Sequence, residues 1–191
     1  SVKHLLVDEM QDYSPVQYRL LSKIFPCKKT ILGDAAQNVN PYSSTTADDI
    51  RKALYKAEIM KLNKSYRSGY EITELAKSIS GNSEIDVVER HTEKPQLIEV
   101  SSREAESQLM REMIMEVDVN NPTSTAYIFK LEKDAIAFFE SLGELQKRAT
   151  LLVSGCQAFT NGIVVTTSHM AKGLEFDEVV IPNVTKANYN D

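Results

Sequence analysis

The stretch HLLVDEMQD, from His4 to Asp12, decides the fold. Leu5 to Val7 has the apolar character of a short buried strand, and acidic side chains follow it directly. In an open sheet of parallel strands, the side chains just past the carboxyl ends of the strands line the place where ligands bind. Adjacent Asp8 and Glu9 suit nucleoside triphosphate hydrolysis, in which one carboxylate holds Mg²⁺ and the other orients or deprotonates the attacking water. The alternative is an acidic turn after an edge strand, because Asp-Glu pairs are common.

Outward from this stretch, strand-like and helix-like segments alternate along the chain. Pro15 opens a predicted helix that runs to Phe25, in which apolar residues recur every three or four positions. Strands separated by helices imply an α/β fold built on parallel sheets. Further strands are predicted at 30–32, 97–100, 126–129, 151–153, 163–166 and 179–181, and further helices at 47–57, 70–79, 103–117 and 132–145. Residues 80–95 read as a loop.

Composition excludes several classes of protein. The 191 residues are 42% hydrophobic and 26% charged, with a net charge of −5, which argues against disorder and against a surface dominated by basic residues. The sequence contains no apolar run near the ~18 residues that a membrane helix needs, so we expect a cytoplasmic protein without a membrane partner. Cys27 and Cys156 form no metal-binding pair, and the spacing of His4, His91 and His169 does not fit a structural zinc site.

Charge also changes along the chain. Residues 1–60 contain 8 basic and 7 acidic side chains, whereas residues 61–191 contain 14 and 20. We therefore predict a domain boundary near residue 60, giving domains 1–60 and 61–191. Because Ser occupies position 1 and a strand-like run begins at Val2, we expect the sequence to be a piece of a longer protein.

Two short segments after the first strand carry further candidate side chains. Gly33 to Gln37 (GDAAQ) ends the second predicted strand, where the Gln37 amide could reach a phosphate or a water above the sheet. Arg67 stands at the start of a helix, and its permanently charged guanidinium could neutralise charge on a transferred phosphoryl group. The alternatives are an ordinary strand-to-loop turn and a surface arginine beside a helix cap formed by Ser68.

The segment TTSHMAKGLEF, residues 166–176, is harder to explain by packing. It places hydroxyls, an imidazole, a lysine and a flexible glycine in one connection after the strand that begins at Ile163. Such a loop could present hydrogen-bond donors to a polynucleotide backbone and the Glu175 carboxylate to a ribose hydroxyl. The alternative is a polar loop with a helix cap.

Taken in order, these segments resemble the motifs of superfamily 1 helicases of the UvrD/Rep type. DEMQD at 8–12 resembles motif II (DExQD, the Walker B box), and GDAAQ at 33–37 resembles motif III (GDxxQ). LNKSYRS at 62–68 resembles motif IV (LxxNYRS), with Ser65 where Asn is usual, and TSHMAKGLEF at 167–176 resembles motif V (TxHxxKGLEF). The resemblance implies RecA-like parallel sheets with helices on both faces. Residues 1–60 would be part of one such domain, and 61–191 most of a second.

Two motifs of that family have no counterpart in this sequence. These are the GxxxxGKS/T phosphate loop (motif I, Walker A), which lies upstream of motif II, and motif VI with its late arginine, which should follow Ile181. We therefore expect the isolated chain to be inactive, because the phosphate-loop lysine and backbone cradle the nucleotide. The short distance from motif II to motif V is closer to the helicase IV (HelD-like) branch, some members of which act on RNA polymerase.

The resemblance implies catalytic roles for four residues. Asp8 helps to hold Mg²⁺, and Glu9 is the general base that activates water. Gln37 senses the γ-phosphate of ATP and couples it to DNA contacts. Arg67 acts as an arginine finger supplied by the second domain.

The resemblance also implies contacts with nucleotide and DNA. Gly173 and Glu175 meet the nucleotide. Thr167 and His169 touch the DNA backbone, and Tyr42, which follows motif III, stacks on a base.

The expected function is therefore that of a fragment of an ATP-dependent DNA helicase or translocase. ATP hydrolysis would drive movement along single-stranded DNA and unwinding of the duplex. Two alternatives remain open at this point. One is an ATP-driven remodeller of RNA polymerase, and the other is a non-catalytic interaction module of a larger protein.

Overall fold

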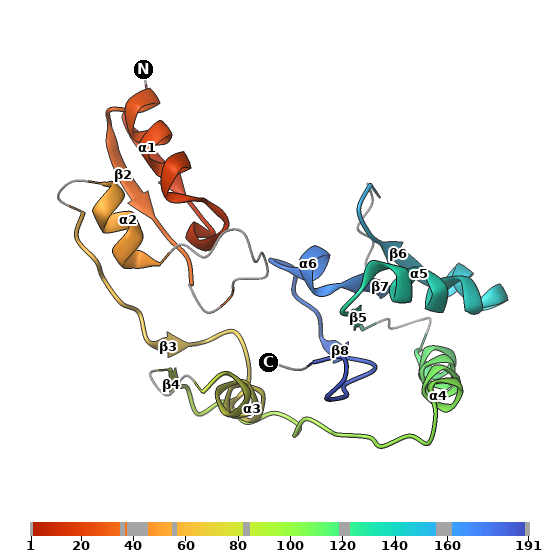
Figure 1. Cartoon of the computed structure of the whole chain (residues 1–191). Helices are drawn as coiled ribbons and strands as arrows, with labels where there is room; N and C mark the ends of the chain where they lie inside the picture. Colours follow the sequence, from red (N-terminus) through yellow and green to blue (C-terminus); the bar gives the residue numbers. More distant parts are fainter. Residues whose placement is uncertain are drawn as a thin grey trace. The chain divides into compact units, whose positions relative to one another are not determined.

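The chain forms two compact units, Ser1–Leu97 and Ile98–Asp191, which Figure 1 shows in red to green and in green to blue. The computed structural model describes residues 2–34, 37, 46–54, 57–81, 85–118, 123–155 and 162–189. The division between the units does not coincide with the boundary expected near residue 60, because residues 61–97 lie with the first unit. The assignment of 1–60 and 61–191 to two helicase domains stays a prediction.

The first unit begins with two parallel strands joined by a helix. β1 (His4–Val7) pairs with β2 (Lys28–Ile31), with Val7 opposite Ile31. Burial alternates along both strands, so that one face of the sheet packs on the core and the other is exposed. The helix α1 (Pro15–Ile24) connects them. This arrangement confirms the predicted strand before Asp8 and the helix that opens at Pro15.

The two helices of this region begin where their side chains cap the backbone. At α1, the Ser14 side chain and Gln17 form a capping box, and Pro15 occupies the first turn. At α2 (Ala47–Ala53), Thr46 and Asp49 form a second capping box. The apolar faces of the helices meet the sheet in a small core of Val7, Tyr18 and Ile50, flanked by half-buried Leu5, Met10, Tyr13, Leu21, Ile31, Ala53 and Leu54.

A second pair of short parallel strands precedes and follows α3 (Tyr70–Ser80). β3 (Lys64–Ser65) pairs with β4 (Asp86–Val87). The prediction of a loop over residues 80–95 is wrong at Asp86 and Val87, because these two residues form a strand that pairs with β3, which precedes α3. Two-residue strands have too few side chains to give a periodic signal, so the sequence alone could not reveal this pairing.

The second unit is built on a four-stranded parallel sheet with strand order β6-β7-β5-β8. The strands are β5 (Thr125–Phe129), β6 (Ala149–Leu152), β7 (Ile163–Thr167) and β8 (Glu178–Val180). The central strands β5 and β7 pair along their full lengths and are almost entirely buried. Continuous apolar strands of this kind are typical of parallel sheets covered by helices.

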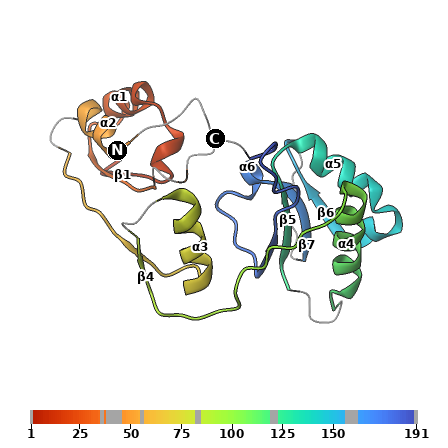
Figure 2. The same ribbon diagram turned by 60° about the horizontal axis from the view of Figure 1, so that its bottom comes forward.

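Two helices cover one face of this sheet. In Figure 2, α4 (Arg103–Glu116) and α5 (Glu132–Ser141) lie together on one side of it, and the short α6 (Ser168–Ala171) follows β7 on the other. Aromatic and aliphatic side chains from the sheet and the helices interlock in this core. Its buried members are Met110, Ile114, Tyr127, Phe129, Ala135, Phe138, Leu142, Val153, Ile163 and Val165.

Two predicted elements of this unit are wrong in part. Residues 97–100, all of which the structure describes, are an exposed segment without strand pairing, and Leu97 is 84% exposed. A run of apolar residues does not form a strand without a neighbour to accept its hydrogen bonds. The helix predicted at 132–145 ends at Ser141, because Gly143 adopts a positive φ of 57° and a 3₁₀ turn, η3 (Gly143–Arg148), follows. Within the described residues, no helix is long and apolar enough to cross a membrane.

Candidate functional site

The carboxylates predicted to act on nucleotide lie just past the end of β1. Asp8 is exposed, and its Oδ1 accepts a hydrogen bond from the backbone N–H of Glu9 at 2.8 Å. Glu9 is half-buried and adopts a left-handed backbone conformation with φ 53° and ψ 55°. Such a conformation is uncommon for a residue other than glycine and is found where the surrounding structure holds it. It turns the chain out of the strand and into the 3₁₀ turn η1 (Met10–Asp12).

Gln11 joins the ends of the two strands through its side-chain amide. The side chain is buried, with 1% of its surface exposed. Its Nε2 donates to Oε2 of Glu9 at 2.6 Å, and its Oε1 accepts from the backbone N–H of Asp34 at 3.2 Å. A buried amide with both ends satisfied is conformationally restrained. Sequence reasoning gave Gln11 no role, although its place within the DEMQD segment was a usable signal.

Backbone contacts hold the same turn against β2. The N–H of Met10 donates to the carbonyl of Leu32 at 2.9 Å, and the N–H of Leu32 donates to the carbonyl of Val7 at 2.8 Å. Gly33 follows with φ 156°, and a Cβ there would lie 2.5 Å from the nitrogen of Met10. Only glycine allows the two strand ends to approach so closely.

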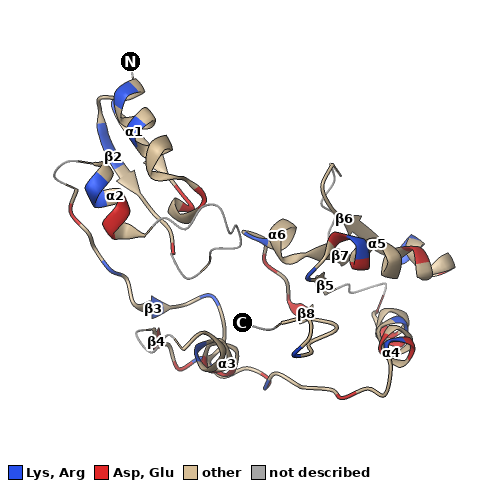
Figure 3. Ribbon diagram, viewed as in Figure 1, with Lys and Arg blue, Asp and Glu red and all other residues tan. Residues whose placement is uncertain are grey.

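Gln37 completes the set of polar groups at these strand ends. It is exposed, its N–H donates to the carbonyl of Asp34 at 3.1 Å, and its Nε2 donates to Oδ2 of Asp34 at 3.1 Å. Figure 3 colours the ribbon red at acidic residues in the turn that follows β1 and blue at Lys and Arg residues on α1 and β2. Asp8, Glu9 and Gln37 therefore all lie at the carboxyl ends of β1 and β2, the edge where open parallel sheets bind ligands.

Magnesium could be held at this edge by one carboxylate. Within the described residues, no group of three or more His, Cys, Asp or Glu side chains could hold a metal ion. Mg²⁺ in nucleotide sites is commonly bound by one or two carboxylates together with phosphate oxygens and water. The exposed carboxylate of Asp8 fits that kind of site, in which the nucleotide supplies further ligands.

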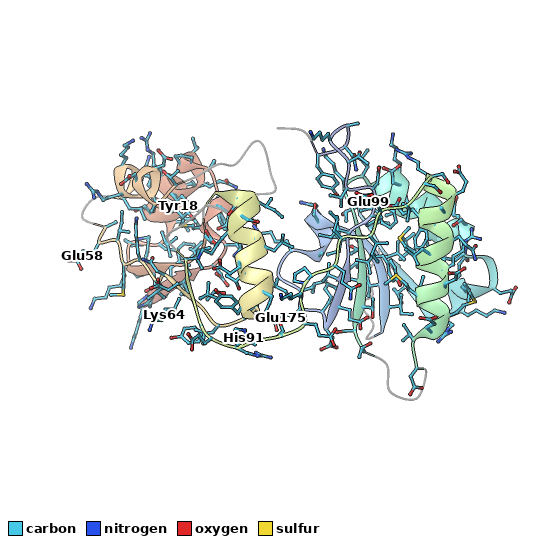
Figure 4. The ribbon with its side chains drawn as sticks, turned by 90° about the horizontal axis from the view of Figure 1, so that it is seen from below. Tyr18, Glu58, Lys64, His91, Glu99 and Glu175 are labelled. Carbon is cyan, nitrogen blue, oxygen red and sulfur yellow. The ribbon has the colours of Figure 1, made fainter. Side chains whose placement is uncertain are left out.

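Arg67 lies in an exposed turn between β3 and α3. The helix that follows is anchored by the segment around His91. Oε2 of Glu71 accepts from the N–H of Thr92 at 2.9 Å, and Oε1 of Glu71 lies 2.8 Å from Nδ1 of His91. These hydrogen bonds lower the pKa of Glu71 to about 2. Figure 4 labels His91 on the extended segment that passes this end of α3.

The residues expected to meet nucleotide and DNA in the second unit follow β7. Thr167, the last residue of that strand, is 5% exposed, whereas His169 on α6 and Glu175 are exposed. Gly173 adopts φ 81°, a conformation that favours glycine, directly after the short helix. The predicted stacking residue Tyr42 lies outside the described residues, so its role stays a prediction.

These geometries define a class of fold before any relative is considered. Parallel strands with helices packed against them and polar side chains past their carboxyl ends are the arrangement of open α/β domains. The C-terminal domain of a possible DNA helicase from Lactobacillus plantarum WCFS1 superposes with a TM-score of 0.52 at 28% sequence identity. The match covers 66% of this chain and 73% of that one. The predicted fold class, α/β of RecA-like type, is confirmed.

Sequence comparison points to a more particular group. Residues 1–58 match the UvrD/REP helicase N-terminal domain. The chain is 34% identical over 86 residues, 42% of its length, to DNA helicase II of Haemophilus influenzae. It is also 34% identical over 85 residues, 41% of its length, to the ATP-dependent DNA helicase srs2 of Schizosaccharomyces pombe. It spans only 12% and 10% of the length of these two proteins. In the matched segments, the chain is thus similar to UvrD-type DNA helicases.

Proposed function

We propose that this chain is part of an ATP-dependent DNA helicase or translocase and carries the residues that activate water for ATP hydrolysis. The observation that carries the proposal is the placement of Asp8, Glu9 and Gln37 at adjacent strand ends. Gln11 and Asp34 connect Glu9 to Gln37, and Asp8 accepts from the N–H of Glu9. Similarity of residues 1–58 to the UvrD/REP helicase N-terminal domain supports it.

Each side chain would contribute a separate step. Mg²⁺, when bound by Asp8, would neutralise charge on the phosphates of ATP. Glu9 would accept the proton of the attacking water, since its carboxylate is held in one orientation. The exposed amide of Gln37 would contact the γ-phosphate, and Arg67 would stabilise charge in the transition state. The remaining parts of the nucleotide site, including a phosphate loop, would come from the rest of the protein.

Residues of the second unit would contact nucleotide and DNA. Gly173 and Glu175 follow α6, where an exposed carboxylate could accept a hydrogen bond from a ribose hydroxyl. His169 is exposed on the same helix and could donate to a phosphate of the DNA backbone. Thr167, at the end of β7 just before α6, would contact the DNA backbone as well. Tyr42 would provide a stacking surface for a base. Both curated relatives are named as DNA helicases, which favours DNA over RNA polymerase as the substrate. The helicase IV branch and an RNA polymerase partner stay predictions.

The test is the substitution Glu9→Gln in the longer protein that carries this chain. It preserves size and hydrogen-bonding capacity but removes the base, so DNA-stimulated phosphate release should fall by roughly 10²–10⁴-fold. Nucleotide binding, measured with a fluorescent ATP analogue, should remain. Glu58→Gln, the same change at an exposed residue of the same unit, is the matched control and should leave turnover unchanged. Wild-type hydrolysis by Glu9→Gln would remove the proposed water-activating site.

A further inference from the structure

We propose that Gln11 is a positioning residue for the proposed general base. Its side-chain amide would fix the carboxylate of Glu9 in the orientation needed to take a proton from water and tie that orientation to the end of β2. This inference rests on the proposed function, because it assigns a role within the same site.

The first line of evidence is the geometry of the amide. Gln11 has 1% of its surface exposed, and its two polar ends are used differently. Nε2 donates to the Glu9 carboxylate at 2.6 Å, while Oε1 accepts from the Asp34 backbone at 3.2 Å. The hydrogen bond from Nε2 of Gln11 goes to one of the two carboxylate oxygens of Glu9, Oε2. A general base needs both a lone pair directed at the proton and a fixed direction of approach.

The second line of evidence is that the surrounding residues hold Gln11 in place. The hydroxyl of Tyr18, itself 1% exposed, donates to the Met10 carbonyl at 2.9 Å and so anchors the peptide that precedes Gln11. On the other side, a Cβ at Gly33 would lie 2.6 Å from Oε1 of Gln11. The absence of that atom leaves room for the amide. The backbone of Glu9 is left-handed, and this conformation sets the direction of its Cα–Cβ bond.

The third line of evidence is continuity with Gln37. The backbone N–H of Asp34 binds Gln11, and the carboxylate of Asp34 accepts from Nε2 of Gln37. If Gln37 moved on binding a phosphate, Asp34 would move with it, and the hydrogen bonds of Gln11 would pass this displacement to the carboxylate of Glu9. Within this path Gln11 is buried and its contact with Asp34 is to a backbone N–H, which restrains small displacements, whereas the contact between the Asp34 and Gln37 side chains is exposed.

The kinetic experiment uses two substitutions in the longer protein. Gln11→Glu keeps the size and the oxygen that accepts from Asp34 but removes the donor to Glu9, and Gln11→Met removes both contacts at similar volume. A base displaced by about 1 Å can cost ~10²-fold in rate, so both should lower kcat by roughly 10–100-fold. The KM for ATP should change by less than about threefold, because Gln11 would act on the chemical step and not on binding.

Gln17→Glu is the matched control. It makes the same change of charge as Gln11→Glu in the same unit, where Oε1 of Gln17 accepts from the N–H and the hydroxyl of Ser14 in the cap of α1. Turnover is expressed per folded molecule, with the folded fraction measured by circular dichroism. Gln17→Glu should keep the parental kcat. If kcat in the Gln11 variants falls only in proportion to folding, or if KM rises instead, the positioning role is overturned.

A spectroscopic experiment on the 191-residue chain needs no substitution of Gln11. The side-chain amide of Gln11 is followed by ¹⁵N–¹H NMR in wild type, in Glu9→Ala and in the control Glu58→Ala. Removing the acceptor should shift the Gln11 amide resonance and speed its exchange with solvent, whereas the control should change neither. An amide unaffected by Glu9→Ala overturns the inference. Parental turnover in Glu9→Gln overturns the proposed function instead, so the two failures are distinguishable.

Discussion

At the scale of single residues, the proposed site combines exposed polar side chains with buried ones that hold the turn after β1. Asp8, Gln37 and Arg67 are exposed, whereas Gln11 and Tyr18 are almost wholly covered. The buried groups restrain the turn that bears the carboxylates. Substitutions of exposed residues should therefore alter rate without altering the fold, and substitutions of the buried ones should alter stability or geometry.

Arg67 provides the first residue-scale prediction. If it supplies charge to the transition state, Arg67→Ala and Arg67→Lys in the longer protein should both lower turnover by about 10³–10⁵-fold. Lysine should rescue poorly because it lacks the planar, bidentate guanidinium. Arg51→Ala and Arg51→Lys, at an exposed arginine of α2, are the controls. DNA-stimulated ATPase activity and thermal melting of the same variants are the measurements. Parental turnover in both Arg67 variants would place this arginine outside the active site.

The second residue-scale prediction concerns pH. Burial raises the pKa of Tyr18 and of Tyr127 from the ordinary 10.0 to about 12. A phenol with a raised pKa stays protonated in the folded state while the unfolded chain loses its proton, so its contribution to stability is complete below pH 10 and is lost as the pH rises toward 12. Urea denaturation at pH 8 to 11.5 should show this loss, and Tyr18→Phe with Tyr127→Phe should flatten it. If the free energy of unfolding falls with pH as steeply in the double variant as in wild type, the prediction is contradicted.

At neutral pH the same two substitutions should act in opposite ways. Tyr18→Phe removes the hydroxyl that donates to the Met10 carbonyl, which keeps the N–H of Tyr13 at 3.3 Å as a second donor, and should cost about 1 kcal/mol. Within the described residues, the buried hydroxyl of Tyr127 has no hydrogen-bond partner, so Tyr127→Phe should be neutral or stabilising. Tyr66→Phe, at a side chain that is 69% exposed, is the control. Equal destabilisation by both buried substitutions would contradict this assignment.

At the scale of elements, α3 is held by a segment distant from it in sequence. Glu71, in its first turn, accepts hydrogen bonds from Thr92 and lies against His91, and the N–H of Tyr70 donates to the carbonyl of Arg90 at 2.9 Å. A carboxylate in the first turn of a helix also interacts favourably with the helix dipole. The start of the helix that follows Arg67 is thus set by tertiary contacts as well as by local sequence.

The element-scale prediction follows from the lowered pKa of Glu71. A carboxyl group with a pKa of about 2 when folded and an ordinary value of 4.5 contributes stability above pH 4.5 and loses it as the pH falls toward 2. Glu71→Gln should therefore lower the melting temperature at pH 7, and the difference from wild type should shrink between pH 5 and pH 2. Glu74→Gln removes a half-exposed ion pair with Lys77, three residues along the same helix, and should have little effect. A Glu71 difference that is independent of pH would contradict the prediction.

At the scale of the whole molecule, two units with unequal cores lie in one chain. Among the described residues, the core of Ser1–Leu97 around β1 and β2 has three buried apolar residues, whereas the core of Ile98–Asp191 has ten. Residues 91–100, which join the units, are exposed along their length and form no helix or strand. Small cores give low stability, because less apolar surface is removed from water.

The whole-molecule prediction is that the units unfold separately. Differential scanning calorimetry of the full chain should show two transitions, with the unit that contains the four-stranded sheet melting at the higher temperature. Limited digestion with a glutamyl endoproteinase should cut first at Glu93 or Glu99, and mass spectrometry should identify the resistant product as the C-terminal unit. A single cooperative transition together with protection of Glu93 and Glu99 would show that the chain unfolds as one body.

The sequence by itself determined the longer helices and the longer strands, but not β3, β4 or the state of residues 97–100, and it determined the position of the acidic residues. The helix that begins at Pro15 and the strands around Val7 and Val165 follow from apolar periodicity, capping residues and turn residues. All of these depend on side chains a few residues apart. Asp8 and Glu9 directly follow an apolar run, so their place at a strand end could be predicted as well.

Only the tertiary structure decided how distant segments meet. Gln11 meets the N–H of Asp34 because β2 pairs with β1, whereas its other partner, Glu9, lies two residues away in the same turn. The pairing of β3 with β4 and the strand order β6-β7-β5-β8 likewise join residues far apart in sequence. The apolar run at 97–100 has strand-like composition but no neighbouring strand. A strand exists only where another backbone accepts its hydrogen bonds, and no local pattern specifies which backbone that will be.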